Sequence, residues 1–471
     1  MDYERLDAIV ASYREDIIRD IQKWVAVPSV LSAAADGAPF GKETRRALDV
    51  ALETAKGYGF AARDVDGYCG DVTMCEGEKT MGMLCHLDVV PAGDGWTKDP
   101  WGGEVADGKL YGRGTMDDKG PAVAALHAMR AVREAGIPMK DGVKLILGCD
   151  EETGMTDMRY YKTKMPAPDY GFSPDAEFPV INIEKGGLGL LMTAYTAEKG
   201  GEFPLVSMHA GERCNVVPGT ATAVVSTKGP GFKELKARVK AVTEARGFAL
   251  ECEKLKDKKA LITATGKPSH ASMPELGVNA AGMLLIALKE MNAGGPLHGA
   301  ISALADKLGL EHDGAALGIK IADEESGALT CNLGLLRADK RFVSAQLDIR
   351  YPLSADEEKM CGQAATALAG TPLALRKLRG HAPHHVPKEH KVVSGLVKVY
   401  SEVTGQPGYA FAIGGGTYSR TMPNTVAFGF NFPGDTDTCH MPDEYVDIEK
   451  LMLSVKIFAH AIAELAGGAH Q

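Results

Sequence analysis

Apolar residues recur at helical spacing in two segments near the start of the chain. Within residues 3–24 they fall three or four positions apart, and Pro28, which cannot continue a helix, follows soon afterwards. Residues 43–58 have the same spacing and are followed by Gly59, and glycine commonly ends a helix. The pattern therefore predicts two helices ahead of the first strands.

Short apolar segments then alternate with a helical segment. Strands are predicted at 60–66, 71–76, 80–86 and 143–148, and a helix at 121–134. The last of these strands, VKLILG, is apolar except for Lys144, which is typical of a strand buried on both faces of a sheet. Strand, helix and strand in this order indicate a βαβ unit, and hence an α/β fold with a mixed sheet flanked by helices.

The pattern changes near residue 187. Sheet-like alternation is predicted at 188–228, 248–266 and 326–351, with helices at 232–246, 279–290 and 355–368. The α/β rhythm resumes after residue 384, with helices at 391–403 and 448–466 and strands at 408–413 and 425–430. We therefore expect a discontinuous core domain, 1–186 and 385–471, interrupted by an α+β lid or substrate domain at 187–384.

The composition excludes several classes of function. A chain of 471 residues is long enough for two or three domains, and its net charge of −10 without a basic stripe argues against nucleic-acid binding. Residues 1–24 carry too many charges for a secretory signal, and no apolar run approaches the roughly 20 residues that span a bilayer. Nine cysteines without CxxC spacing indicate reduced thiols. We therefore expect a cytoplasmic protein that binds neither nucleic acid nor membrane.

Polar residues with metal-binding chemistry stand where predicted strands end. His86 ends the strand at 80–86 and Asp88 follows it, and the two point to the same side, as residues i and i+2 do in a strand. A histidine that binds metal through one ring nitrogen often donates the N–H of its other ring nitrogen to a carboxylate, so this pair suits a metal site. The alternative is that the two residues are only a polar strand edge, which is common. Glu151 and Glu152 follow the strand at 143–148, and ligand sites in α/β sheets lie beyond such carboxyl ends.

The candidate ligands are carboxylates and imidazoles without cysteine pairs. They are His86, Asp117, Glu151, Glu152, Asp175 and His440. This set suits zinc, manganese or cobalt in an open catalytic site more than a structural zinc site. Acidic residues at several strand ends repel one another unless cations balance them, and two metals sharing a bridging carboxylate would do so. For Asp117 the alternative is a favourable charge at a helix N-terminus.

Five separated motifs carry a resemblance to a known family. They are HLDVVPAGDGW at 86–96, GRGTMDDKGP at 112–121, DEETG at 150–154, SPDAEFP at 173–179 and GKPSHASMP at 266–274. The chain resembles the co-catalytic di-zinc metallopeptidases, the group of aminoacylase, carboxypeptidase G and succinyl-diaminopimelate desuccinylase. It is most similar to the dipeptidase V branch, and the likeness covers nearly the full length. The resemblance implies a catalytic core domain and a lid of two similar subdomains.

The resemblance also implies roles for single residues in the core domain. Asp117 would bridge two divalent metals, His86 and Asp175 would complete one site, and Glu152 and His440 the other. The bond between Asp117 and Asp118 would be cis. Asp88 would orient His86, and Glu151 would be the general base that takes a proton from the water and delivers it to the leaving amine. The expected metal is zinc, with manganese or cobalt as alternatives.

For the lid, the resemblance implies residues that bind substrate. His270 would reach the scissile carbonyl oxygen, Asn215 and Arg350 would bind substrate, and Gly415 and Gly416 would offer backbone N–H groups to its carboxylate. A guanidinium suits a carboxylate through its planar fork. The alternatives are a turn histidine for His270 and a salt bridge on a strand for Arg350.

The resulting hypothesis is a monomeric, metal-dependent dipeptidase whose substrates are short peptides with a free amino terminus. Within enzymes, the alternative is a deacylase or amidohydrolase acting on N-acyl amino acids. Outside enzymes, the alternative is a non-catalytic metal- or peptide-binding protein, against which the presence of Glu151 argues.

Overall fold

The computed structural model describes residues 3–196 and 200–468, which form two compact units. The first unit comprises Met1–Ile183, His385–Phe411 and Gly416–Gln471, and the second comprises Glu184–His384 and Ala412–Gly415. We propose that these units are the two domains expected from the sequence, with the short segment 412–415 added to the second.

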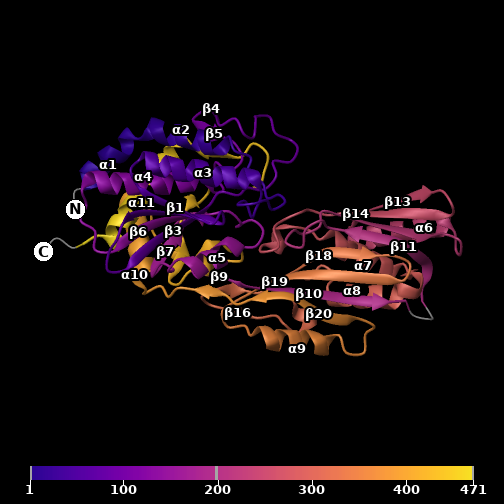
Figure 1. Ribbon diagram of the computed structural model, residues 1–471. Coiled ribbons are helices and arrows are strands. Elements are labelled where there is room, and N and C mark those ends of the chain that lie inside the picture. The colour runs from indigo at the N-terminus through magenta and orange to yellow at the C-terminus, as the bar shows by residue number, and fades with distance from the viewer. Residues whose placement is uncertain (1–2, 197–199, 469–471) are drawn as a thin grey trace. The chain divides into compact units, whose positions relative to one another are not determined.

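The first unit is built on a mixed sheet with strand order β1-β2-β6-β3-β7-β23-β9 (Figure 1). The strands are β1 (Ala61–Val65), β2 (Cys69–Cys75), β3 (Thr80–His86), β6 (Gly142–Gly148), β7 (Tyr170–Ser173), β9 (Val180–Glu184) and β23 (Thr425–Ala427). β3 pairs in parallel with both β6 and β7, and β23 pairs in parallel with β7. The carboxyl ends of β3, β6 and β7 therefore lie together at one edge of the sheet.

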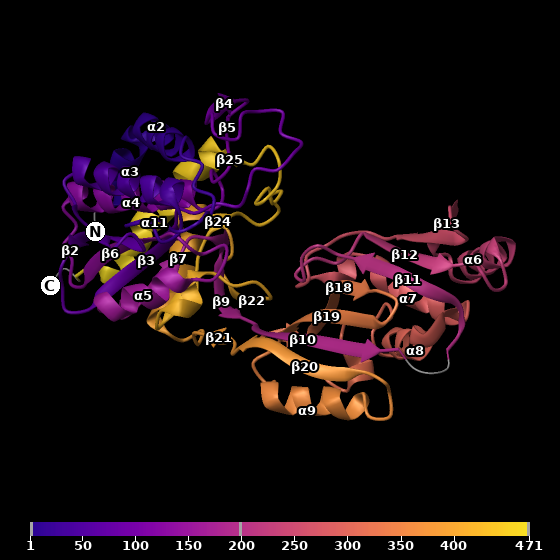
Figure 2. The same cartoon turned by 45° about the vertical axis from the view of Figure 1, so that its right-hand side comes forward.

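Helices cover both faces of this sheet, so the predicted α/β class is confirmed (Figure 2). The helices of the unit are α1 (Tyr3–Ser12), α2 (Arg14–Val25), α3 (Lys42–Gly57), α4 (Lys119–Ala135), α5 (Thr156–Lys164), α10 (Lys391–Thr404) and α11 (Ile448–Ala466). Along β6, Leu145 and Leu147 join the core with α4 and α11, whereas Ile146 joins the opposite core with α5. Every residue of β6 is buried, as expected from its mostly apolar sequence, and this includes Lys144, which pairs with Asp71 of β2.

The structure differs from the predicted helices in two respects. The helix predicted over residues 3–24 is interrupted at Tyr13, whose buried ring packs beside His127 of α4. The short helices α5 and α8 (His298–Lys307) were not predicted, and α5 is a largely polar segment, TDMRYYKTK, with no clear apolar stripe.

The second unit contains a sheet of strand order β13-β14-β12-β11-β18-β19-β10-β20. The strands are β10 (Gly186–Tyr195), β11 (Glu202–Ala210), β12 (Thr220–Ser226), β13 (Ala249–Leu255), β14 (Lys259–Thr265), β18 (Thr330–Ala338), β19 (Phe342–Tyr351) and β20 (Ala374–His381). Neighbours along this order are antiparallel, and the sheet is continuous across the unit because β11 pairs with β18.

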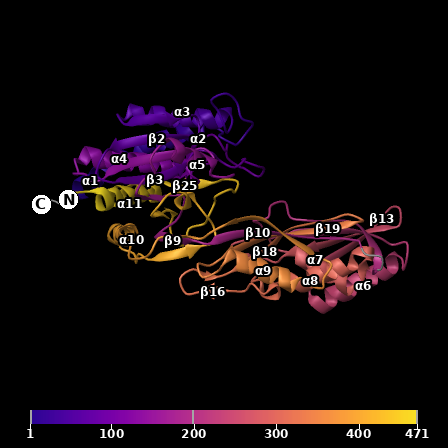
Figure 3. The same ribbon diagram turned by 60° about the horizontal axis from the view of Figure 1, so that its bottom comes forward.

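Helices line one face of this second sheet (Figure 3). They are α6 (Phe232–Arg246), α7 (Ala280–Glu290), α8 and α9 (Glu357–Ala367). Alternate strand residues such as Leu188 and Leu190 of β10 pack against them. The other face, to which Gly187 and Gly189 of β10 project, carries Asp348 and Arg350 of β19 and Arg379 of β20. Within the described residues, no helix is both long and apolar enough to cross a membrane.

Smaller strands complete the chain. They are β4 (Glu104–Ala106), β5 (Lys109–Tyr111), β8 (Ala176–Glu177), β15 (Ala293–Gly294), β16 (Ala322–Asp323), β17 (Gly327–Ala328), β21 (His384–His385), β22 (Ala410–Ile413), β24 (Phe430–Asn431) and β25 (Tyr445–Asp447). β25 pairs with β5, which brings the segment that follows His440 beside the segment that precedes Asp117.

Candidate metal centre and substrate-binding residues

The candidate ligands of the first unit come from the carboxyl ends of three parallel strands and from two loops. His86 ends β3, Glu151 and Glu152 follow β6, and Asp175 follows β7. Asp117 lies in the loop before α4, and His440 lies in the loop between β24 and β25. Segments far apart in the sequence thus converge at one edge of the sheet.

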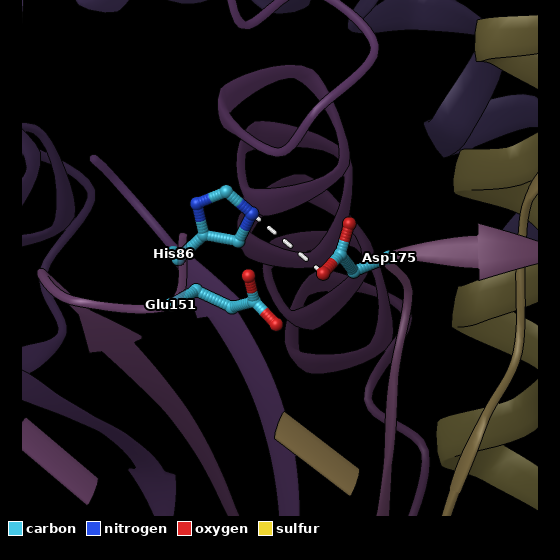
Figure 4. Close-up of side chains that lie close together, drawn as sticks. All are labelled: His86, Glu151 and Asp175. Atoms are coloured by element: carbon cyan, nitrogen blue, oxygen red, sulfur yellow. Dashed lines mark ion pairs between the residues drawn. The ribbon is translucent and has the colours of Figure 1, made fainter. Parts of the chain in front are cut away.

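The first cluster consists of His86, Glu151 and Asp175, whose candidate ligand atoms all lie within 4.8 Å of one another (Figure 4). Nε2 of His86 is 3.6 Å from Oδ2 of Asp175 and 2.9 Å from Oδ1 of Asp117. This nitrogen is buried and makes no hydrogen bond to any described residue. A buried ring nitrogen aimed at carboxylate oxygens fits a metal ligand.

The second cluster consists of Asp117, Glu152 and His440. Nε2 of His440 is 2.9 Å from Oδ2 of Asp117 and 3.0 Å from Oε1 of Glu152. Asp117 therefore turns one carboxylate oxygen to His86 and the other to His440. This is the position that a ligand bridging two metals would need.

The electrostatics of the clusters also fit bound cations. Burial and the negative charge of Asp117 raise the pKa of Asp175 to about 7, and burial and Asp175 raise the pKa of Glu151 well above its usual range. Although burial opposes it, the neighbouring imidazoles of His440 and His86 hold the pKa of Asp117 below its usual range. So many partly buried carboxylates repel one another, and divalent cations would relieve that repulsion.

Asp88 contacts the ring of His86 and also the backbone of two glutamates. Nδ1 of His86 lies 2.8 Å from the backbone carbonyl oxygen of Asp88, whereas the Asp88 carboxylate is 3.6 Å from that nitrogen. The carboxylate instead accepts hydrogen bonds from the backbone N–H groups of Glu151 and Glu152, each at 3.2 Å. Asp88 thus connects the histidine at the end of β3 to both glutamates after β6.

The peptide bond between Asp117 and Asp118 is cis, which confirms the expectation from the resemblance. The Asp118 side chain makes no capping hydrogen bond to α4, and its Oδ2 accepts a hydrogen bond from the backbone N–H of His86 at 2.9 Å. Asp118 therefore connects the loop of Asp117 to β3.

Sequence reasoning missed Glu444, a fully buried carboxylate four positions after His440. Its Oε1 accepts hydrogen bonds from the backbone N–H groups of Gly114 (3.0 Å), Met116 (2.9 Å) and Asp117 (3.2 Å), and its Oε2 pairs with the buried guanidinium of Arg113. The acidic residues after His440 were the only signal in the sequence, and they do not reveal partners that are backbone atoms of a distant loop.

Asp157 and Tyr418 were also missed. Oδ2 of Asp157 accepts hydrogen bonds from the backbone N–H groups of Cys149 (2.6 Å) and Asp150 (2.9 Å) and from the hydroxyl of Tyr418. The buried ring of Tyr418 stands edge-on to the ring of His86, with centroids 6.2 Å apart. These two side chains fix the turn that presents Glu151 and Glu152.

The predicted lid residues belong to the second unit, with one exception. Ala271, next to His270, donates its N–H to the carbonyl of Asn215 at 2.9 Å, and Val216 forms a β-bridge with His270. Nη1 of Arg350 donates to the carbonyl of Gly414 at 3.1 Å. His270 and Asn215 are thus neighbours within this unit.

The glycine loop is divided between the two units. Gly415 belongs to the second unit, whereas Gly416 belongs to the first. Arg350 also makes the strand salt bridge that was its alternative, because its guanidinium contacts Asp348 of the same strand through two nitrogens.

Comparison with known proteins agrees with this architecture. A sequence model of the peptidase family M20/M25/M40 matches residues 82–464. The chain is 35% identical over 461 residues to a putative dipeptidase, YtjP, of Bacillus subtilis (strain 168), covering 96% of this chain and 98% of that protein. It is 34% identical over 459 residues to a Beta-Ala-Xaa dipeptidase of Lactobacillus delbrueckii subsp. lactis, covering 96% of each.

Solved structures share the fold at low sequence identity. Human carnosine dipeptidase 1 superposes with a TM-score of 0.59 at 14% identity, covering 99% of each chain. The dipeptidase Dug1p of Saccharomyces cerevisiae also gives a TM-score of 0.59 at 14% identity, covering 98% of each chain. At this identity these two likenesses support the fold alone.

Proposed function

Because the chain belongs to the peptidase family M20/M25/M40, we propose that it hydrolyses dipeptides that carry a free amino terminus. The observation that carries this proposal is the placement of Asp117 between His86 and His440, with one carboxylate oxygen toward each ring. Relatives named as dipeptidases match nearly the whole chain, which supports the choice of dipeptides among peptide substrates.

The residues present fit two divalent metal ions, for which we propose zinc, with manganese or cobalt as alternatives. His86 and Asp175 would hold one ion, Glu152 and His440 the other, and Asp117 would contact both. Ions bound there would lower the pKa of a coordinated water and polarise the scissile carbonyl.

Glu151 is the proposed general base. Its carboxylate stands in the cluster with His86 and Asp175, and its backbone N–H is held by Asp88. Burial and the neighbouring Asp175 raise its pKa, which suits a group that takes a proton from water and then gives it to the leaving amine. We assign Glu151 to proton transfer and Glu152, which faces His440, to metal binding.

The second unit is proposed to recognise the peptide. His270 would donate a hydrogen bond to the carbonyl oxygen that becomes negative in the transition state. Arg350 and Asn215, with the N–H groups of Gly415 and Gly416, would hold the terminal carboxylate. We further propose a monomer acting in the cytoplasm, where its nine free cysteines would stay reduced.

A substrate panel tests this proposal. The purified chain, loaded with zinc or with manganese, is incubated with dipeptides, tripeptides and N-acetylated amino acids, and products are separated by chromatography. Dipeptides with a free amine should be cleaved fastest. Preference for substrates with a blocked amine would replace the dipeptidase by the deacylase alternative, and no cleavage of any substrate would favour a binding protein.

A further inference from the structure

Two glycines of β10 leave a strip of the second sheet without side chains. β10 lies between β19 and β20, and Gly187 and Gly189 project to the face opposite the helices. Gly187 is opposite Arg350 of β19, and Gly189 is opposite Asp348 of β19 and Arg379 of β20. Side chains from the two flanking strands can therefore meet above β10.

The space above these glycines is already filled by the neighbouring strand. A Cβ at Gly189 would lie 2.9 Å from Cγ of Arg379, and a Cβ at Gly187 would lie 2.3 Å from Nε2 of His381. Any larger residue at either position would displace a side chain of β20. The glycines thus allow Arg379 to reach across β10 toward β19.

Asp348 joins the two arginines. Its carboxylate is 2.6 Å from Nε and 3.1 Å from Nη2 of Arg350, and 3.0 Å from Nη2 of Arg379. The Asp348 side chain is only 3% exposed, so it is a fixed acceptor rather than a mobile surface group. One carboxylate therefore orients two guanidinium groups, and the three side chains together carry one net positive charge.

The two arginines differ in what they can still bind. Nε, Nη1 and Nη2 of Arg350 each contact a protein acceptor, and its side chain is 14% exposed. Arg379 is 63% exposed and is held by Asp348 through Nη2, so most of its five N–H donors face solvent. Of the pair, Arg379 has more donors available to a ligand.

We propose that Arg379 is a second guanidinium that binds the terminal carboxylate of the peptide substrate, and that Asp348 positions it beside Arg350. The proposal rests on the proposed dipeptidase function, in which Arg350 binds that carboxylate. The single net positive charge of the three side chains matches the single negative charge of such a ligand. Asp348 spaces the two guanidiniums, which would otherwise repel each other.

The test compares L-alanyl-L-alanine with its C-terminal amide, which lacks the negative charge. Arg379→Ala should lower kcat/KM for the free dipeptide about tenfold to a hundredfold, chiefly through KM, and leave kcat/KM for the amide unchanged. Arg379→Lys should restore part of the loss. Arg376→Ala removes another exposed arginine of β20 and is the matched control. It should leave kcat/KM unchanged for both the free dipeptide and the amide.

Each outcome decides the matter. If Arg379→Ala lowers kcat/KM for the free dipeptide and for its amide equally, its effect is structural and the proposal is wrong. If it lowers kcat/KM for neither substrate, Arg379 does not bind the carboxylate. If the unmodified chain cleaves no dipeptide, the proposed function fails first, and the assignment of Arg379 fails with it. Failure of the proposed function is therefore distinguished from failure of the Arg379 assignment, because only the former is seen in the unmodified protein.

Discussion

The carboxylate of Glu444 accepts a hydrogen bond from the backbone N–H of Asp117 at 3.2 Å. The accepting oxygen is Oε1, which also accepts hydrogen bonds from the backbone N–H groups of Gly114 and Met116 in the loop of Asp117. Because Glu444 follows His440 by four positions, one buried side chain connects the loops that supply two proposed ligands. The distance between Asp117 and His440 therefore depends on a residue that is not itself a member of either cluster.

Glu444→Ala should weaken metal binding and lower the melting temperature. The substitution leaves the N–H groups of Gly114, Met116 and Asp117 and the guanidinium of Arg113 without their buried acceptor. Loss of such supporting groups typically costs about 10- to 100-fold in metal affinity, which competition with a chromogenic chelator measures. Glu449→Ala, which removes a 78% exposed carboxylate of α11, is the control. Unchanged affinity in Glu444→Ala would show that the loop is held by other contacts.

Glu151→Gln should abolish most turnover while the metal stays bound. General acid–base catalysis contributes about 10²- to 10⁴-fold, and the amide cannot take up the proton. Elemental analysis beside the rate measurement separates the two effects, and His86→Ala, which should lose metal and activity together, is the comparison. Loss of metal in Glu151→Gln would assign Glu151 as a ligand, a role that its place in the cluster with His86 and Asp175 would also allow.

Removal of divalent metals should lower the melting temperature of the chain. Without cations, the partly buried carboxylates of Asp117, Glu151, Glu152 and Asp175 repel one another, and the folded state loses the ligand that binds it preferentially. Scanning calorimetry before and after dialysis against a chelator measures the change, and added zinc or manganese should reverse it. A melting temperature that is insensitive to both treatments contradicts the presence of this metal centre.

The burial of His127 should make stability fall in mildly acidic solution, although the neighbouring Asp20 opposes the effect. Nε2 of the fully buried His127 lies 2.9 Å from Oδ2 of Asp20, and burial lowers the pKa of the histidine. In the unfolded chain, His127 takes up a proton near its ordinary pKa of about 6.5, whereas the folded chain resists protonation until a lower pH. The free energy of unfolding therefore decreases as pH falls through about 6.5, because the unfolded state binds more protons.

Urea unfolding between pH 5.5 and 7.5 tests this pH dependence. His127→Gln removes the titrating group, so the mutant should show a smaller slope than the unmodified chain over this range. Equal slopes would mean that His127 is not the group responsible.

Much of the fold could be predicted because it depends on local patterns. The spacing of apolar residues predicted helices that match α6 and α11 to the residue, and the apolar run of β6 is buried on both faces. The short polar helix α5 gave no such pattern. At the break between α1 and α2, Tyr13 packs beside His127 of α4, a contact that the local sequence does not reveal.

The candidate metal ligands were identifiable because metal-binding side chains occur at predicted strand ends and within recognisable motifs. The supporting residues were not, because their partners are distant. Glu444 binds backbone N–H groups, and Asp348 meets Arg379 only across a strand whose glycines leave the space open. Asp88 was expected to hold His86 through its carboxylate, but the structure uses the Asp88 carbonyl for the ring and the carboxylate for the two glutamate N–H groups.

Titration of the metal-free chain with zinc or manganese, while cleavage of L-alanyl-L-alanine is followed, tests the central claim most directly. If Asp117 holds two ions between His86 and His440, activity should rise with added metal and reach its plateau at about two ions per chain. Activity that is complete at one ion, or that persists without metal, would contradict the two-metal dipeptidase.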